Sequence, residues 1–296
     1  MTVMQRFSLG KLSVARIGFG AMQLPGPGVF GPPRDHDEAL AVLRRAVELG
    51  VNHIDTAQYY GPNVANELIR EALYPYPDDL VIVSKVGGRR DDTGAWLPAG
   101  EPDELRRGIE GNLHTLGLDQ LAAVNLRVMD SDAADHRQPG QLRREQLDKQ
   151  LTAMIKARDE GLIAGIGLSN ITREHLLFAL ERTEIVCVQN AYNLIDRSSQ
   201  PVLDECTARG IAFVPFFPLG SGFARDNPVL GNDVVSRTAQ RLGRTPAQVV
   251  LAWTLTVAPN VLLIPGTSSR RHVEENMAVA DIELDGDTHH QLNAVA

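Results

Sequence analysis

Three residue types that together could tune a proton donor follow two apolar, strand-like runs in the first third of the chain. The run Val51–Ile54 leads directly into Asp55, and Tyr60 comes five residues later. A second run, Leu80–Ser84, ends in Lys85. A phenol with an ordinary pKa of about 10 becomes a useful general acid only when a nearby cation and carboxylate adjust that pKa. Because an acid, a phenol and an amine follow neighbouring strands, the spacing predicts a site for proton transfer.

These side chains need a scaffold that brings strand ends together, and the pattern of the chain predicts one. Short apolar runs alternate with longer amphipathic stretches. Strands that alternate with helices pair in parallel, because each return needs a crossover, and eight such strands close a (β/α)8 TIM barrel. The expected strands are Arg16–Ala21, Val51–Asp55, Leu80–Lys85, Leu121–Leu126, Ile163–Leu168, Ile185–Asn190, Ile211–Pro215 and Val261–Ile264. The expected helices are Asp35–Leu49, Asn66–Leu73, Asp103–Leu116, Leu142–Glu160, Arg173–Arg182, Gln200–Ala208 and Thr245–Thr256.

An open doubly wound sheet is the alternative architecture for such a pattern. Gly18-Phe19-Gly20, in the first run, is only a fragment of the GxGxxG fingerprint that a dinucleotide-binding sheet of that kind would carry. We therefore expect residues 1–296 to form one α/β domain, a (β/α)8 barrel. The residues Phe7–Val14 predict a β-hairpin that plugs one end of the barrel.

Loops that follow the strands of such a barrel would choose the substrate. The four stretches rich in Gly, Pro or polar residues at these places are Leu24–Arg34, Gly87–Pro102, Ser131–Gly140 and Ser221–Asn232. Phe30, Trp96 and Phe223 within them could line an apolar pocket or simply cover the barrel. Nothing in the composition of these loops names a substrate.

The bulk composition excludes several classes of function. The chain has 296 residues, of which 43% are hydrophobic and 22% charged, as in ordinary globular proteins. A formal charge of -8 argues against a dedicated surface for nucleic acid or anionic membranes, although a local basic pocket for a phosphate is compatible with it. No run has the length of a signal-peptide core or a membrane span. Cys187 and Cys206 predict buried, reduced thiols. We expect a cytoplasmic protein with no nucleic-acid partner, no membrane and no metal site.

A set of further motifs appears in the same order as in a known family. They begin at Ile17–Met22 and include Asp55, Tyr60 and Lys85, then Gly165–Asn170, Val188–Asn193, Ile264–Thr267 and Glu275–Asn276. Together they resemble the aldo-keto reductase family over nearly the whole chain. The resemblance implies a barrel that binds NADP(H) extended across the C-terminal ends of its strands. It also implies reduction of a small aldehyde or ketone to an alcohol.

The resemblance assigns roles to the first three residues. Tyr60 would be the general acid that protonates the carbonyl oxygen, and its five-residue spacing from Asp55 favours it over its neighbour Tyr59. Lys85 would lower the pKa of the phenol and stabilise the developing oxyanion. Asp55 would keep the ammonium charged and fixed in place.

The fourth position of the family's site, usually a His at the end of the fourth strand, is different here. A gapless register places Arg127 there, whereas a register slipped by three residues places Asp130 there. We favour Arg127, whose guanidinium offers fixed donors but cannot act as an acid at neutral pH. Pyridoxal reductases within the family carry a similar replacement, so pyridoxal or another small aldehyde is the expected substrate.

The remaining motifs resemble the family's cofactor contacts. Ser169, Asn170 and Gln189 match the residues that hold the nicotinamide carboxamide, and Phe216 matches a ring that stacks on it. Thr267, Ser268 and an Arg at the start of a helix would suit the 2′-phosphate of NADP. The other implied contacts are Gly20, Met22, Pro218, Leu219, Gly266, Arg270, Arg271, Glu275 and Asn276.

Two departures at the helix start leave NAD open as the cofactor. Gly266 replaces the family's usual Lys, and His272 occupies the usual Arg position, while Arg270 and Arg271 are both candidates for the phosphate. The leading interpretation is an NADPH-dependent reductase that acts as a monomer. The alternative is a regulatory module that binds the cofactor and turns over little.

Overall fold

A ring of parallel strands forms the centre of the computed structural model, which describes residues 5–129, 142–220 and 227–295. Seven strands pair in parallel in the order β10-β9-β8-β7-β5-β4-β3. Their bounds are β3 (Phe19–Gly20), β4 (His53–Asp55), β5 (Val81–Arg90), β7 (Ala123–Arg127), β8 (Ile166–Ser169), β9 (Cys187–Ala191) and β10 (Ala212–Phe216).

Residues 261–263 take the eighth position and close the ring. Val261 bridges Phe213 on β10, and Leu263 bridges Ile17 just before β3, both in parallel. The backbone bonds that join the edges include Leu262 N to Phe213 O at 2.9 Å and Gly18 N to Leu263 O at 2.7 Å. The TIM-barrel architecture expected from the sequence is therefore confirmed.

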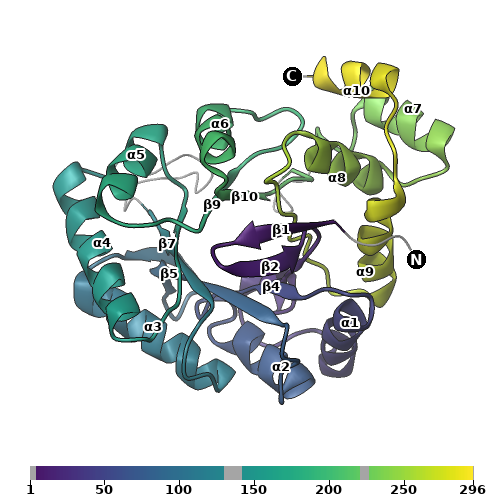
Figure 1. The fold of residues 1–296 in the computed structure, drawn as a ribbon. Coiled ribbons are helices and arrows are strands. Elements are labelled where there is room, and N and C mark those ends of the chain that lie inside the picture. The colour runs from purple at the N-terminus through teal and green to yellow at the C-terminus, as the bar shows by residue number, and fades with distance from the viewer. Residues whose placement is uncertain (1–4, 130–141, 221–226, 296) are drawn as a thin grey trace.

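Helices surround the strands as an outer layer (Figure 1). This layer contains α1 (His36–Glu48), α2 (Val64–Leu73), α3 (Pro102–Leu116), α4 (Arg144–Asp159), α5 (Arg173–Arg182), α6 (Gln200–Arg209), α8 (Pro246–Thr256) and α9 (Arg270–Met277). Two helices that the sequence did not predict, α7 (Asp233–Leu242) and α10 (Gly286–Asn293), pack on one another beside α8. Local sequence sets the ends: the Asp35 side chain accepts from Glu38 N at the start of α1, and Gly117 ends α3 with φ +67°.

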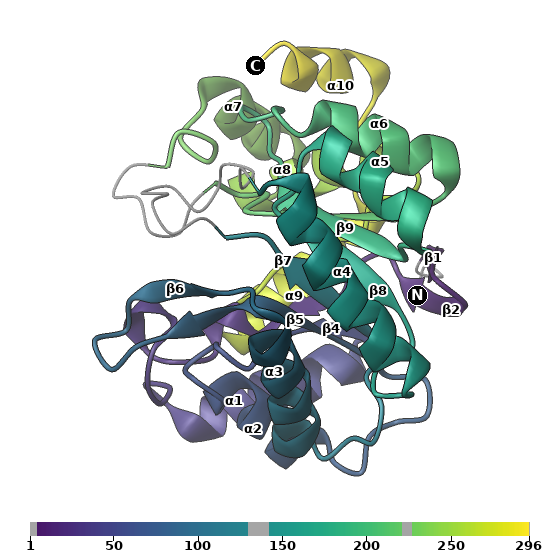
Figure 2. The ribbon, with the colours of Figure 1, turned by 90° about the vertical axis from the view of Figure 1, so that its left-hand side faces the viewer.

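The predicted hairpin closes one end of the barrel. Strands β1 (Arg6–Leu9) and β2 (Leu12–Ala15) pair antiparallel, and Figure 2 shows them at the opposite end of the barrel from β6 (Trp96–Ala99). Leu9 and Val14 are buried in an apolar cluster with residues from the barrel interior. The other members of this cluster are Val81, Val83, Ala123, Cys187, Ala212, Val214 and Leu262. The hairpin thus caps the N-terminal end and leaves the C-terminal ends of the strands for the site.

Replacing Leu9 by Ala is expected to lower the free energy of unfolding by about 2–5 kcal/mol, because the side chain is 2% exposed and its removal leaves a cavity under the hairpin. Urea unfolding followed by circular dichroism measures the change. Leu12→Ala on the same hairpin is the matched control, since Leu12 is 38% exposed and should lose little. Equal losses in the two variants would contradict the packing described here.

The stretch Gly87–Pro102 is partly strand, where the sequence suggested a loop. β5 continues to Arg90 and pairs antiparallel with β6, with Arg90 opposite Trp96. Gly87 has φ +101°, and a Cβ there would lie 2.2 Å from the carbonyl oxygen of Arg127. The glycine therefore allows close approach of β5 to β7 and does not mark the end of the strand.

Three further observations concern the described part of the chain. Both cysteines are free and buried as expected, and burial raises the pKa of the Cys206 thiol to about 12. Among the described residues, no helix is long and apolar enough to span a membrane. The same residues contain no group of three or more His, Cys, Asp or Glu side chains that could hold a metal ion.

Candidate active site

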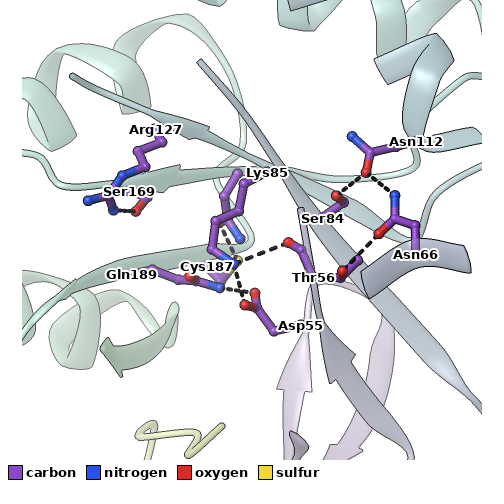
Figure 3. Close-up of polar contacts among 11 residues, drawn as sticks. Asp55, Thr56, Asn66, Ser84, Lys85, Asn112, Arg127, Ser169, Cys187 and Gln189 are labelled. Atoms are coloured by element: carbon purple, nitrogen blue, oxygen red, sulfur yellow. Dashed lines mark hydrogen bonds and ion pairs between the residues drawn. The ribbon is translucent and has the colours of Figure 1, made fainter. Parts of the chain in front are cut away.

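A buried ion pair lies at the C-terminal side of β4 and β5 (Figure 3). Lys85 Nζ pairs with Asp55 Oδ1 and also donates to the carbonyl oxygen of Thr56 at 3.2 Å. Gln189 Nε2 from β9 donates to the other carboxylate oxygen of Asp55 at 2.5 Å. Asp55 is 2% and Lys85 4% exposed, so each charge depends on these partners in place of water.

A chain of buried amide and hydroxyl groups fixes the backbone beside this pair. Thr56 Oγ1 donates to Asn66 Oδ1 at 2.8 Å, and Asn66 Nδ2 donates to Asn112 Oδ1 at 2.9 Å. Ser84 Oγ, next to Lys85, donates to the same Asn112 oxygen at 2.6 Å. Since Asn66 and Asn112 come from α2 and α3, this network ties both strands to the helices behind them (Figure 3).

Tyr60 lies against the ion pair. Lys85 Nζ is 5.1 Å from the centroid of the Tyr60 ring, and the residue is 6% exposed. Burial, followed by the charge of Asp55, raises the pKa of Tyr60 above its ordinary value. Lys85 is not among the causes of this shift, so the lowering of the pKa by Lys85 that the resemblance implied stays a prediction. The phenol therefore keeps its proton at neutral pH.

Tyr59, the alternative phenol, has different surroundings. Its ring packs edge-on against Tyr60 at 5.4 Å and against Trp96 at 5.7 Å between centroids. Its hydroxyl is buried and has no hydrogen-bond partner among the described residues. Burial is also the main cause that raises the pKa of Tyr59. Tyr59 thus packs beneath the site, while the ring of Tyr60 faces Lys85.

Arg127 is the last residue of β7 and joins two of the expected cofactor residues. Its Nη1 donates to Ser169 Oγ at 3.2 Å, and its guanidinium lies 5.1 Å from the centroid of the Phe216 ring. Its charge also acts on Tyr60, where it opposes the rise in pKa. Asp130, the alternative for the same position, lies outside the described residues, as does Phe223.

The three side chains expected to hold a nicotinamide already form some hydrogen bonds within the protein. Asn170 has φ +61°, and its Nδ2 donates to the carbonyl oxygen of Val128 at 3.1 Å. Gln189 uses its Nε2 on Asp55, whereas its Oε1 is buried and has no partner among the described residues. Ser169 accepts from Arg127, as given above. Gln189 therefore presents one unsatisfied acceptor at the C-terminal ends of the strands.

Two glycines meet at the junction between β3 and residues 261–266. A Cβ on Gly20 would lie 2.5 Å from the carbonyl oxygen of Ile264, and a Cβ on Gly266 would lie 2.5 Å from the carbonyl oxygen of Gly20. A side chain at either position would require the backbone to shift. Met22 follows on a short 3-10 helix, Ala21–Gln23, and is partly buried.

The start of α9 carries the expected phosphate residues. Thr267 Oγ1 accepts from Ser269 N at 3.1 Å, and Ser268 is exposed. Arg270 donates to Glu38 from both its backbone N, at 3.1 Å, and its Nε, at 2.9 Å. Arg271, whose side chain is 78% exposed, donates to Glu275 at 2.8 Å.

The last expected cofactor residues lie beside this helix and after β10. Asn276 is partly buried on α9. Pro218 and Leu219 are partly buried in the loop that follows Phe216, where Asn227 Nδ2 donates to the carbonyl oxygen of Leu219 at 2.8 Å. The structure thus brings the sequence-predicted residues among the described ones to the C-terminal ends of the strands or to α9, where Glu275 and Asn276 lie in the last turn.

Comparison with known proteins decides the family. The model of the aldo/keto reductase family matches residues 16–296. The chain belongs to this family. Pyridoxine 4-dehydrogenase of Escherichia coli is 49% identical over 290 residues, which cover 98% of each chain.

Solved aldo-keto reductases share the fold over the whole chain. A crystal structure of a thermostable member in complex with the inhibitor epalrestat superposes with a TM-score of 0.81 at 28% identity, covering 99% of this chain and 100% of the other. A Klebsiella pneumoniae member in complex with NADP and acetate gives 0.78 at 27% identity, covering 99% and 95%. This aldo-keto reductase is therefore an oxidoreductase.

One buried residue of this aldo-keto reductase was not singled out by the sequence. His53 on β4 is fully buried, and neither ring nitrogen has a hydrogen-bond partner among the described residues. Burial lowers its pKa from 6.5 to about 4, and Lys85 adds to this while Asp55 opposes it. A lone His within an apolar run carries no local signal of such surroundings.

The free energy of unfolding is expected to fall by roughly 3 kcal/mol as the pH drops from about 6.5 to about 4, because His53 takes up a proton in the unfolded chain but not in the folded one. Above pH 6.5 this contribution is constant. Urea unfolding at several pH values measures the slope, and His53→Phe should flatten it. An identical slope in both proteins would exclude His53 as its source.

Proposed function

We propose that this enzyme reduces a small aromatic aldehyde of the pyridoxal type, with NADPH as hydride source and Tyr60 as proton donor. The observation that carries the proposal is the buried Asp55–Lys85 ion pair, with the ring of Tyr60 packed against Lys85 and its hydroxyl protonated. The relative at 49% identity is named pyridoxine 4-dehydrogenase, and oxidation of an alcohol is the reverse of aldehyde reduction. The monomeric state, the cytoplasmic location and the single domain remain predictions.

The residues at this end of the barrel fit a nicotinamide dinucleotide. The unsatisfied Oε1 of Gln189 would accept from the carboxamide NH2, which needs an acceptor. The Phe216 ring, half-buried beside Arg127, offers a face for stacking. Gly20 and Gly266 let the chain at β3 and the chain after residue 264 lie close together, and both segments carry expected cofactor contacts. When bound, NADPH supplies the hydride to the carbonyl carbon.

The start of α9 favours NADP over NAD in this proposal. Arg270 and Arg271 each already hold a carboxylate, of Glu38 and Glu275, so their side chains are placed to bind an anion. A 2′-phosphate would exchange for one of these carboxylates and form bidentate bonds. The NADP complexes of Klebsiella pneumoniae relatives support the same cofactor.

The chain itself provides the proton. The hydroxyl of Tyr60 carries its proton at neutral pH and can donate it to the carbonyl oxygen, while burial raises its pKa and makes it a weaker acid than a free phenol. Lys85, held by Asp55 and Thr56, places a positive charge next to the phenol as negative charge develops on it. Arg127 cannot give up a proton near neutral pH, and it would instead attract anionic or hydroxyl-rich substituents of the substrate.

The function is tested by following NADPH oxidation with pyridoxal, benzaldehyde and a 1,2-dicarbonyl as substrates. Pyridoxal should give the highest kcat/KM. Arg127→His, which restores the family's usual residue, should change the order of preference among the three substrates. A protein that binds NADPH but reduces none of them would contradict the proposal and favour a regulatory role.

Gly266→Ala is expected to weaken NADPH binding about tenfold or more and to lower the free energy of unfolding by about 1–3 kcal/mol, since the added Cβ would meet the Gly20 carbonyl at 2.5 Å. Fluorescence titration with NADPH and urea unfolding measure the two effects. Gly286→Ala is the matched control, because a Cβ there has no atom within 4 Å. If Gly266→Ala binds NADPH as tightly as Gly286→Ala and the parent protein do, Gly266 does not shape the cofactor site.

A further inference from the structure

Arg90, at the end of β5, lies among carbonyl groups from two loops that follow barrel strands. Its Nη1 donates to Val29 O at 2.9 Å, its Nη2 to Gly28 O at 3.0 Å, and its Nε to Gly94 O at 2.9 Å. The guanidinium thereby ties the loop after β3 to the hairpin β5–β6, and its acceptors among the described residues are neutral carbonyl groups. Such a fork of fixed donors is a property of Arg that Lys does not share.

The flat faces of the same guanidinium contact aromatic rings from both segments. Its central carbon lies 4.0 Å from the centroid of the Trp96 ring and 5.3 Å from that of Phe30. Trp96 in turn packs edge-on against Tyr60, with 6.4 Å between ring centroids. Arg90 thus holds in place a ring that touches the side chain of Tyr60.

Arg90 also acts on the backbone next to Tyr60. The carbonyl oxygen of Val29 that Arg90 binds accepts from Gly61 N at 3.1 Å, and Gly31 N donates to Gly61 O at 3.1 Å. Val29 has φ +59°, a strained conformation for a β-branched residue that persists only when its surroundings hold it. Gly61 directly follows Tyr60, so the loop that contains Val29 and Gly31 holds the backbone of Tyr60, while Trp96 contacts its ring.

We propose that Arg90 is a positioning residue for Tyr60, which it holds through Trp96 on the ring side and through Val29 and Gly61 on the backbone side. The proposal rests on the function proposed above, in which Tyr60 gives the proton. A displacement of a reacting group by about 1 Å can cost about 100-fold in rate. Loss of the Arg90 contacts should therefore slow proton transfer and leave cofactor binding intact.

The experiment compares Arg90→Gln with a matched control, Arg16→Gln. Arg16 also donates to three carbonyl oxygens, of Val261, Leu255 and Ala258, at 3.1, 2.6 and 2.9 Å. It lies between β2 and β3, away from the C-terminal ends of the strands where Tyr60 is found. Any general cost of losing such an Arg appears in both variants.

The expected results separate positioning from stability. Arg90→Gln should lower kcat about 10- to 100-fold, change the Kd for NADPH by less than about twofold, and raise the solvent deuterium isotope effect on kcat. Arg16→Gln should keep kcat within about twofold and leave the isotope effect unchanged. Arg90→Lys keeps the charge but not the fork of donors, so its kcat should be intermediate.

Trp96→Leu keeps the experiment decisive if Arg90→Gln does not fold, since it removes the ring contact with Tyr60 and should also lower kcat. An unchanged kcat in Trp96→Leu, or equal kcat and equal isotope effects in Arg90→Gln and Arg16→Gln, would overturn the positioning role. Tyr60→Phe distinguishes failure of the positioning role of Arg90 from failure of the proposed function. If Tyr60→Phe still turns over like the parent protein, Tyr60 is not the donor and the function proposed above fails as well.

Discussion

Tyr60→Phe is expected to lower kcat for the preferred aldehyde by about 10²- to 10⁴-fold, because it removes the only proton that the site offers to a carbonyl oxygen in this mechanism. NADPH binding should not change, since the ring and its contacts with Lys85 and Trp96 remain. Steady-state NADPH oxidation measures kcat, and fluorescence titration measures the Kd for NADPH.

Tyr59→Phe is the matched control for this prediction. Its hydroxyl is buried without a partner among the described residues, so its removal costs no hydrogen bond. We expect full activity and unchanged or higher stability in this variant. The opposite pattern, an inactive Tyr59→Phe and an active Tyr60→Phe, would transfer the role of proton donor to Tyr59.

Lys85→Met is expected to lower the free energy of unfolding by about 3–5 kcal/mol and to abolish turnover. The change leaves the Asp55 carboxylate charged and buried, and among the described side chains Gln189 is then its remaining hydrogen-bond donor. Urea unfolding measures the first effect and NADPH oxidation the second. Lys156→Met is the same substitution in an exposed ion pair with Glu160, and it should cost at most about 0.5 kcal/mol.

The double variant Asp55→Asn, Lys85→Met tests whether the unpaired charge is the cause. Removing both charges should recover much of the stability lost in Lys85→Met, because no ion then remains buried. Activity should stay absent, since the positive charge beside Tyr60 is gone. A double variant no more stable than Lys85→Met would show that packing, and not the charge of Asp55, accounts for the loss.

The local pattern of the chain was sufficient to predict the barrel. Apolar runs such as Leu80–Lys85 and capped helices such as α1 are encoded within a few neighbouring residues, since periodicity and end signals act over one or two turns. The hairpin β5–β6 was missed because Gly87 and Gly88 resemble a loop in sequence. Only the neighbouring strand shows that Gly87 is there for close approach to Arg127.

The candidate site was predictable in its membership but not in its contacts. Asp55, Tyr60 and Lys85 were found because strand ends in a parallel barrel converge, which is a property of the fold class. That Gln189 donates to Asp55, 134 positions earlier, follows only from the actual arrangement of β9 and β4 across the barrel. The same holds for Arg270, which Glu38 on α1 binds across 232 positions.

The sequence by itself determined the strands of the barrel and most of the helices around them, because these depend on residues close in the chain, but it did not reveal α7, α10 or β6. The tertiary structure decided how the side chains of the site are paired and charged. Burial, which no local pattern shows, raises the pKa of Tyr60 and outweighs the opposing charge of Arg127. Likewise, Arg90 gains its contacts with Val29 and Trp96 only once barrel closure brings the two loops together, because carbonyl groups distant in sequence converge there.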